Sequence, residues 1–385
     1  MDFNLSFEHQ TLRDTAKRFV ETELPRNKVL KWVADKEEPP RELFTKMAEL
    51  GVYNFLMPPE YSGLDQTDPI GLVVFVQELA RASSAICTIY GRSAVILGPS
   101  IAAFGTRAQK DAVIPGIVGG KYVMALGLTE PDAGSDAASI KTKAVEQPDG
   151  SFVINGNKQY TTQLASADWM VLIARSDPDK EKHEGLTAFL IEKPGQHPNI
   201  EYHRLDTMGL SVAPTYTVSI KDLKVTPDQI LGERGKGWQV VLRSLDMERL
   251  YHGAIGVGAS QMIVDEVVAY LNQRIAFGRP LARQQAVRHK VVDMQMGIDA
   301  ARLMTYRAAS KLAAGQECHR EASMAKLSGA ETYMRVANHG LQLMGGYGYC
   351  VDSGMPMHFT DAKLFEIGGG AMEIQRNIIA KEMGM

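Results

Sequence analysis

The hydrophobic pattern of this chain changes its period twice, and this change limits the possible folds more than any other feature of the sequence. From residue 7 to about residue 120, and again beyond Gly235, apolar residues recur at three- and four-residue spacing, which is typical of amphipathic helices. Between these parts lie short runs rich in β-branched residues, at positions 169–174, 186–191 and 216–220. The pattern predicts helices, then strands, then helices.

The length of the chain predicts more than one domain, because 385 residues are too many for one hydrophobic core. We expect an N-terminal helical domain at residues 1–120, a β domain at residues 121–232 and a C-terminal helical domain at residues 233–385. Asp149 and Asn155 are each followed by glycine, and such dipeptides favour tight hairpin turns. Both are expected in turns near the start of the β domain.

Composition excludes several classes of protein. The net charge of −3 gives no electrostatic reason to expect binding to nucleic acid. Three widely separated cysteines form no CxxC pair, which argues against a disulfide framework and a zinc site. No uncharged apolar run reaches 18 residues, so we expect no membrane insertion. The first residues lack the pattern of a signal peptide, and a cytoplasmic location is expected.

Most short catalytic motifs are missing, and one polar segment stands out. Gly256 and Gly258 lack the third glycine of a dinucleotide fingerprint and lie in a helical stretch. Residues 127–136 instead gather hydroxyls, acids and glycines after the first expected strand. The amides and hydroxyls of Thr129, Gly134 and Ser135 could hold a polar ring edge or a phosphate, although a plain turn is the alternative.

Several separate stretches together resemble the acyl-CoA dehydrogenase family. The resemblance spans nearly the whole chain and is carried by residues 127–139, 159–162, 274–278, 284–285, 342–348 and 361–363. It implies the family fold, in which an N-terminal helical domain, a central β-barrel and a C-terminal four-helix bundle follow one another. It also implies FAD as the cofactor and an acyl-CoA thioester as the substrate.

The resemblance assigns FAD contacts to individual residues. Leu126, Leu128 and Thr129 would hydrogen-bond the pyrimidine edge of the flavin, Tyr160 would lie against one face, and Thr162 would donate to the reactive ring nitrogen. Other implied FAD contacts are Gly134, Ser135, Phe277, Gln342, Ala371 and Glu373.

A second subunit would complete the FAD site. Arg274 and Gln285, with Gly345 and Gly346 of a neighbouring subunit, would hold the pyrophosphate and adenosine. The resemblance therefore implies a homo-oligomer, either a dimer or a tetramer.

The resemblance also implies contacts to the CoA arm or the base. Ser135 would contact FAD or the CoA arm. Asp246 and Arg249, three residues apart and so on one helix face, would contact the pantetheine or position the base.

The reaction needs a carboxylate that removes the α-proton of the thioester. The usual position of this glutamate in the family corresponds here to Gly369, which has no side chain and would instead border the acyl group. A second family solution places the glutamate directly before an arginine on the helix after the β domain, and Glu248 stands there before Arg249. Glu366 and Glu373 are rival candidates. The alternative for Glu248 is a solvated glutamate or an ion pair with Arg249 or Arg243.

The expected reaction is dehydrogenation of an acyl-CoA to the 2-enoyl-CoA, with electrons passed to an electron-transferring flavoprotein. Two alternatives are an enoyl-CoA reductase that runs the same chemistry backwards and a lyase that eliminates a β-substituent. Glycines at residues 368–370 are expected to leave room for a bulky acyl group, and Gly369→Glu is expected to restore some activity in a Glu248→Gln variant if the pocket tolerates the side chain. Residues 87–95 would line the acyl tail, where Arg92 could bind a polar group or form a surface ion pair.

Overall fold

The computed structural model describes residues 4–385 and confirms the succession of helices, strands and helices. The N-terminal part is helical, with α1 (Phe7–Glu23), α2 (Arg26–Asp35), α3 (Arg41–Glu49), α4 (Pro59–Ser62), α5 (Pro69–Ala82), α6 (Ser84–Gly91), α7 (Gly98–Phe104) and α8 (Arg107–Val118). A π-helical turn, η2 (Arg92–Leu97), joins α6 to α7.

Local sequence signals explain where these helices begin. The side chain of Asp68 accepts the amide of Gly71 at the start of α5, and Pro69 occupies the first helical position. Thr106 and Gln109 form a reciprocal capping box at the start of α8. The apolar stripe of α5 that the sequence predicts, which includes Leu72 and Val76, is fully buried.

The β domain is one mixed sheet. Its strands are β1 (Met124–Gly127), β2 (Lys143–Glu146), β3 (Phe152–Thr162), β4 (Trp169–Arg175), β5 (Leu186–Glu192), β6 (Ile200–Arg204), β7 (Thr215–Val225) and β8 (Ile230–Leu231). The hydrogen-bonded order is β6-β7-β3-β2-β4-β5-β8, and β1 pairs in parallel with β4. The three expected strands are therefore confirmed within β4, β5 and β7.

One of the two expected turns is wrong. Asp149 and Gly150 do form the tight turn between β2 and β3, and Gly150 has a left-handed φ of 80°. Asn155 and Gly156 instead lie inside β3, at a register shift against β7. Gly156 is extended there, and Thr142 packs so closely that a Cβ at position 156 would lie 2.7 Å from the Cα of Thr142. Close packing, rather than a turn, explains this glycine.

The C-terminal part is a bundle of long helices. These are α9 (Gly237–Gln273), α10 (Gln285–Ala313), α11 (His319–Tyr349), α12 (Met355–Ile367) and α13 (Met372–Glu382). A small hairpin, β9 (Ile275–Ala276) and β10 (Arg279–Pro280), connects α9 to α10. Gly256 and Gly258 lie inside α9, where they pack against Gly329 of α11 and Gln77 of α5. The sequence expectation that they are not a dinucleotide fingerprint is consistent with this packing.

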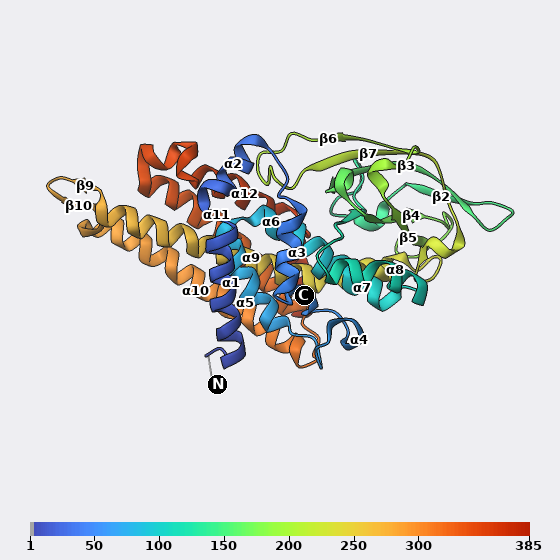
Figure 1. The fold of residues 1–385 in the computed structure, drawn as a ribbon, viewed down its shortest axis with the longest axis horizontal. Coiled ribbons are helices and arrows are strands. Elements are labelled where there is room, and N and C mark those ends of the chain that lie inside the picture. Colours follow the sequence, from blue (N-terminus) through green and yellow to red (C-terminus); the bar gives the residue numbers. More distant parts are fainter. Residues whose placement is uncertain (1–3) are drawn as a thin grey trace.

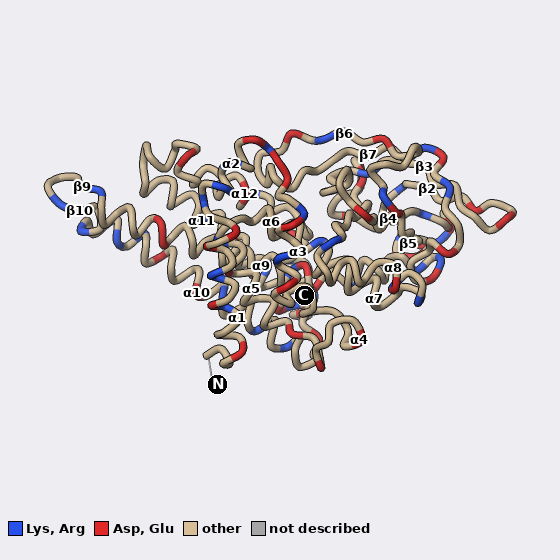
Figure 2. The backbone as a smooth tube through the Cα atoms, viewed as in Figure 1, with Lys and Arg blue, Asp and Glu red and all other residues tan. Residues whose placement is uncertain are grey.

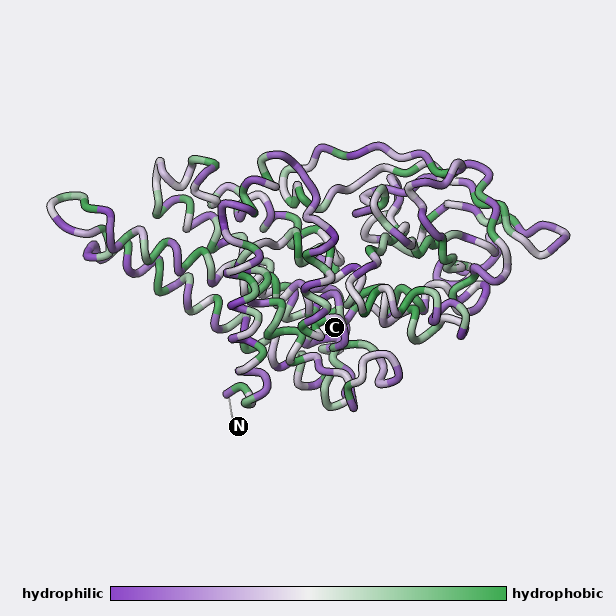
Figure 3. Tube along the Cα trace, viewed as in Figure 1, coloured by the Kyte–Doolittle hydropathy of each residue, from purple (hydrophilic) through white to green (hydrophobic). Residues whose placement is uncertain are grey.

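The three parts are arranged along the longest axis of the molecule. Figure 1 shows the β domain at one end and the β9–β10 hairpin at the other, with the N-terminal helices packed over the middle of the bundle. Acidic and basic residues are interspersed along the chain, with uncharged stretches between them (Figure 2). The strongly apolar stretches lie in the centre (Figure 3), where α5, α6, α7 and α9 contribute to one hydrophobic core. The β domain has a second core of its own.

Two helical stretches are long and apolar enough to cross a membrane by length and composition alone. They are residues 84–104 and α9, and in their most apolar windows 83% and 61% of the residues are buried inside the fold. Core helices of soluble proteins pass the same test, so these stretches are weak evidence for a membrane span.

A buried carboxyl group joins the β domain to the bundle. Asp361 of α12 accepts a 2.7 Å hydrogen bond from the backbone amide of Leu210, a residue with a left-handed φ of 54° in the loop between β6 and β7. Burial raises the pKa of Asp361 to about 7, although the hydrogen bond opposes this shift. The folded protein therefore holds this proton more tightly than the unfolded chain.

We predict that Asp361→Asn stabilises the protein more at pH 8 than at pH 5. The stabilising contribution of protonated Asp361 is complete below pH 4 and is lost as the pH rises through about 7, whereas asparagine does not titrate. The difference in unfolding free energy between variant and wild type should grow over this window by a few kcal/mol, on the order of 1.4 kcal/mol for each pKa unit. Denaturant unfolding at several pH values measures it. Asp179→Asn, in an exposed loop, is the control, and an equal difference at both pH values would contradict the prediction.

Candidate active site

The residues expected to bind the flavin ring lie together at the exits of β1 and β3. The backbone amide of Gln159 donates to the carbonyl of Thr129 at 2.8 Å. The Nζ of Lys158 donates to the carbonyl of Leu128 at 3.1 Å and to Oε1 of Glu130 at 2.8 Å. These bonds fix the segment at Leu126–Thr129 against β3, beside Tyr160 and Thr162. We refer to residues 126–129 and 160–162 as the β platform.

Lys158 is the buried support of the β platform. Its side chain is fully buried, and burial lowers its pKa to about 8 despite the favourable charge and hydrogen bond of Glu130. Glu130 also accepts the backbone amides of Lys141 and Thr142. A buried ion pair with this many hydrogen bonds favours one geometry of the loop that follows β1.

Tyr160 has an unusual backbone for a strand residue. Its φ is 58°, it lies at a register shift between β3 and β7, and 63% of its surface is exposed. A bulge of this kind re-aims a side chain, and a non-glycine residue with positive φ is a common sign of a functional site. The exposed ring, next to the β1 exit, fits a planar group stacked on the platform. Thr162 lies half-buried beside it, 3.4 Å from the hydroxyl of Thr215.

Gly134 and Ser135 lie on the exposed loop that leaves the platform. No atom lies within 4 Å of the place where a Cβ on Gly134 would stand. The loop is therefore open to a ligand at this point, as a residue contacting FAD or the CoA arm requires.

The two positions considered for the base, residues 248 and 369, lie close together in the structure. A Cβ placed on Gly369 would lie 3.7 Å from the carboxyl carbon of Glu248, which approaches from α9. Glu248 is half-buried and makes no hydrogen bond or ion pair within residues 4–385. The expected alternative, an ion pair with Arg249, is not formed, because Arg249 pairs with Asp246 at 2.8 Å. Glu248 therefore presents an unpaired carboxylate to the space that a glutamate at position 369 would fill.

The rival carboxylates are placed differently. Glu366 pairs with Lys363 of the same helix at 2.6 Å, and Glu373 is exposed in the first turn of α13. Ala371 stands at the N-cap of that helix. Asp246 also contacts His319 of α11, so the Asp246–Arg249 pair is fixed beside the base candidate.

Gly369 could not be exchanged for glutamate in the present packing. Its φ is 65°, and a Cβ there would lie 2.6 Å from the ring of His252, whose side chain comes from the next turn of α9 after Glu248. The present packing therefore does not leave the space on which the expected rescue of a Glu248 variant by Gly369→Glu depends. The ring would have to move and the backbone would remain strained.

Two residues near Glu248 were missed by the sequence reasoning. Burial lowers the pKa of His252 to about 3, and the charges of Lys326 and Arg92 add to this shift, so the imidazole is neutral at physiological pH. Lys326 of α11 is fully buried. The signal for Lys326 was present, since it shares a helix face with Ala322, Gly329 and Ala330, all of them buried. A lysine on an otherwise apolar face is unusual.

Arg92 is a half-buried cation at the start of the π-helical turn η2. Its Nε is buried without a hydrogen-bond partner, and Arg92 forms no ion pair among the described residues. The surface ion pair considered from the sequence is therefore not formed. Tyr90, in the same segment, is a buried core residue, and its hydroxyl donates to the carbonyl of Val52 at 2.6 Å.

The residues expected to reach a neighbouring subunit are exposed. They are Arg274, Gln285, Gly345 and Gly346, and two other expected FAD contacts, Phe277 and Gln342, are exposed as well. Phe277 is 93% exposed, and α11 is kinked at Gly345 (φ 59°, ψ −139°), where a Cβ would meet no atom within 4 Å. The hairpin that carries Arg274 and Phe277 lies at the opposite end of the molecule from the β domain (Figure 1). One chain does not bring this group to its own β platform.

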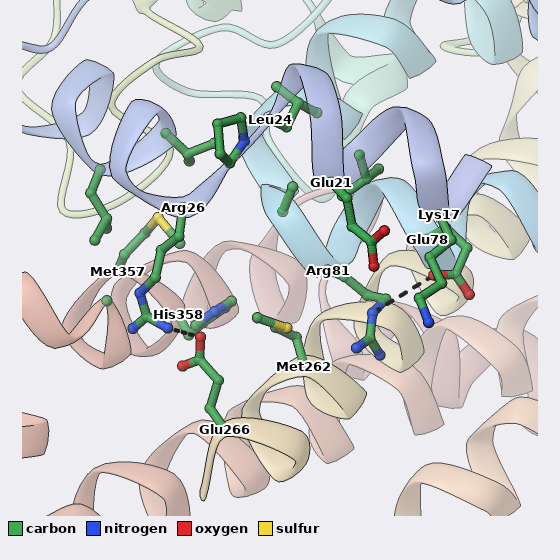
Figure 4. A pocket seen from close by; sticks show the side chains of 16 residues that line it. Lys17, Glu21, Leu24, Arg26, Glu78, Arg81, Met262, Glu266, Met357 and His358 are labelled. Carbon is green, nitrogen blue, oxygen red and sulfur yellow. Dashed lines mark ion pairs between the residues drawn. The ribbon is translucent and has the colours of Figure 1, made fainter. Parts of the chain in front are cut away.

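A hollow with a volume of about 330 Å³ lies away from the site residues described above. It is bordered by α1, α2, α5, α9 and α12, and Figure 4 shows ion pairs on its walls between Arg26 and Glu266 and between Arg81 and Glu78. It contains none of the site residues expected from the sequence. Within residues 4–385, no group of three or more His, Cys, Asp or Glu residues is placed to hold a metal ion.

Comparison with known families gives a consistent result. Three family models match in succession: the acyl-CoA dehydrogenase N-terminal domain at residues 6–121, the middle domain at 125–223 and the C-terminal domain at 235–384. The chain therefore belongs to the acyl-CoA dehydrogenase family, whose members are flavin-dependent, and it is an oxidoreductase that acts on acyl-CoA. The predicted fold class is confirmed.

Individual relatives cover nearly the whole chain. A 3-(aryl)acrylate reductase of Clostridium sporogenes is 32% identical over 98% of both chains. A mitochondrial isovaleryl-CoA dehydrogenase of Arabidopsis thaliana is 34% identical over 89% of this chain and 82% of its own length. The solved structure of butyryl-CoA dehydrogenase from Megasphaera elsdenii is 32% identical, covers both chains completely and superposes with a TM-score of 0.94.

We predict that Glu248→Gln slows flavin reduction by acyl-CoA by roughly 10²–10⁴-fold, the usual contribution of a general base. Glutamine keeps the shape of the side chain and removes the carboxylate, so the bound flavin should be retained. Stopped-flow absorbance under anaerobic conditions measures the rate. Glu366→Gln, which removes only the partner of Lys363, is the matched control. A wild-type rate in Glu248→Gln together with a slow Glu366→Gln would transfer the role to Glu366.

Proposed function

We propose that this protein is an FAD-dependent dehydrogenase that converts an acyl-CoA into the 2-enoyl-CoA, with Glu248 as the base. The observation that carries the proposal is the meeting of Glu248 and Gly369, because it supplies a free carboxylate where the main family position has none. The exposed Tyr160 ring and the open loop at Gly134 support FAD as the flavin. When bound, FAD supplies the acceptor for the hydride that leaves the β-carbon.

The side chains of this protein perform the remaining tasks. Glu248 breaks the α-carbon–hydrogen bond by taking the proton onto its carboxylate, while the electron pair of that bond forms the new double bond. Thr129 and Thr162 would hydrogen-bond the flavin ring and fix its distance from the substrate. The glycines at residues 368–370 leave space beside Glu248 for a bulky acyl group. Electrons would then pass to an electron-transferring flavoprotein.

A reductase is the second candidate function. The relative from Clostridium sporogenes is named a 3-(aryl)acrylate reductase and matches over 98% of this chain, whereas the isovaleryl-CoA dehydrogenase of Arabidopsis thaliana matches over 89%. In that direction Glu248 would return the proton to the α-carbon. The same residues serve both directions, so the electron donor or acceptor decides between them.

Anaerobic titration of the flavoprotein with a panel of acyl-CoA thioesters tests the proposal. If the protein is a dehydrogenase, its oxidised flavin absorbance disappears with at least one saturated thioester. If it is a reductase, its flavin is first reduced chemically, and the oxidised absorbance returns when an enoyl-CoA is added. Products formed without any change in flavin absorbance would indicate a lyase. A purified protein that binds no flavin would overturn the proposal.

Arg92 extends the proposal to the acyl tail. An arginine with a buried, unpaired Nε close to His252 is suited to bind a polar or carboxylate group on the substrate. We predict that Arg92→Ala lowers kcat/KM for ω-carboxyacyl-CoA by roughly tenfold or more relative to plain acyl-CoA of equal length. Arg243→Ala, on the exposed face of α9, is the control. An unchanged ratio between the two substrates would exclude the polar-tail role.

We also propose that the protein is a homo-oligomer. Large apolar side chains are exposed on α10 and near the end of α11, among them Val292, Met296, Leu303, Tyr349 and Val351. Exposed apolar surface of this kind is typical of an interface. A partner subunit there would carry Arg274 and Gln285 to a β platform that the same chain does not reach.

We predict that Arg274→Ala weakens retention of FAD without lowering the melting temperature of the flavin-free chain, because Arg274 is exposed and makes no ion pair within residues 4–385. Gel filtration after dilution, with absorbance at 280 and 450 nm as the readout, measures both the oligomer and its flavin. Arg107→Ala, near the β domain, serves as the control. A variant that keeps one FAD per chain through dilution would contradict the cross-subunit role.

A further inference from the structure

Lys326 is a buried cation for which the reaction described above has no role. Its side chain has no exposed surface, and its Nζ donates a 2.8 Å hydrogen bond to the carbonyl of Gly370. No carboxylate lies within ion-pair distance of it among residues 4–385. A fully buried ammonium without such a partner is unusual, because desolvation of the charge is costly.

The backbone that carries Lys326 is fixed by close helix packing. A Cβ on Gly253 of α9 would lie 2.8 Å from the carbonyl oxygen of Ala325 in α11, and Gly256 meets Gly329 in the same way. Lys326 follows Ala325, and His252 precedes Gly253. The crossing of α9 and α11 therefore sets the distance from Lys326 to the side chains at positions 248 and 252.

The glycine loop, residues 368–370, is held by two side chains. Gly369 and Gly370 both have left-handed φ values, 65° and 84°. The Nε2 of Gln375 donates to the carbonyls of Gly369 at 3.1 Å and of Gly370 at 3.0 Å, and Lys326 supplies the third bond. This loop borders Glu248, so its position decides how an acyl group would face the base.

The charges around Glu248 come from several elements. On α9, Asp246 pairs with Arg249, and His252 is neutral because burial lowers its pKa to about 3. From α11, His319 contacts Asp246. Glu366 of α12 pairs with Lys363, and Glu373 of α13 is exposed. The cations left without a paired carboxylate are Arg92 and Lys326, and Glu248 is the carboxylate that most strongly favours the charged form of Lys326.

We propose that Lys326 is a positioning residue for the reaction, whose hydrogen bond to the carbonyl of Gly370 holds the glycine loop beside Glu248 and against the acyl group. The proposal rests on Glu248 as the base. Burial lowers the pKa of Lys326 itself to about 8, while Glu248, Glu366 and Glu373 oppose that shift, so the ammonium form persists at neutral pH.

Three variants separate the charge of Lys326 from its hydrogen bond. Lys326→Met removes both, Lys326→Gln removes the charge but keeps a hydrogen-bond donor, and Gln375→Met removes donors to the same loop without a change of charge. Replacing a buried charge by methionine should not unfold the protein. The measurement is the rate of flavin reduction by an acyl-CoA, followed by stopped flow from pH 5 to pH 9 with the FAD-loaded enzyme.

Lys326→Met should lower the rate by roughly tenfold at every pH, because the loop loses a hydrogen bond from a charged donor, whereas Lys326→Gln, which keeps a donor, should recover most of the wild-type rate. Gln375→Met should lower the rate by a similar factor at every pH. A wild-type rate in Lys326→Met, or a rate in Lys326→Gln as low as in Lys326→Met, would overturn the proposal. Failure of the proposed function would look different, because Glu248→Gln would then reduce its flavin at the wild-type rate.

Discussion

The close crossing of α9 and α11 is the contact on which the arrangement of the site depends. Gly253 and Gly256 of α9 pack directly on the backbone of α11 at Ala325 and Gly329, and any side chain at these glycines would push the helices apart. Glu248 and His252 lie on α9 at one side of this crossing, and Lys326 lies on α11 at the other. The geometry of the base therefore follows from backbone packing rather than from hydrogen bonds made by Glu248 itself.

The β domain supplies the second rigid surface. The buried Lys158–Glu130 pair fixes the exit of β1 against β3, and the bulge at Tyr160 turns an aromatic ring outward beside it. Each side of the site contains a buried lysine. Lys158 supports the β platform, and Lys326 supports the glycine loop beside Glu248. An acyl-CoA bound between them would meet a carboxylate whose surroundings are set by two helices and a sheet.

Much of this could be predicted from the sequence, because periodicity and turn residues act locally. The β4, β5 and β7 strands and the helical parts follow from spacing alone. The resemblance to the family implies the two possible positions of the base, and the missing side chain at Gly369 then favours Glu248. Tertiary contacts account for the errors. Asn155 and Gly156 resemble a turn, but Thr142 packs on Gly156 inside a strand. A side chain at position 369 would collide with the ring of His252. The apolar helix face that carries Lys326 is visible in the sequence, but the place of Lys326 beside the glycine loop depends on the crossing of α9 and α11.

A crystal structure of the holoenzyme with a 3-thiaacyl-CoA, a thioester analogue that cannot transfer hydride from its third position, tests the central claim most directly. The account predicts a carboxylate oxygen of Glu248 about 3–3.5 Å from the α-carbon, on the side opposite the flavin, with the glycine loop against the acyl chain. A different carboxylate at that distance, or a Glu248 carboxylate turned away from the α-carbon, would contradict it.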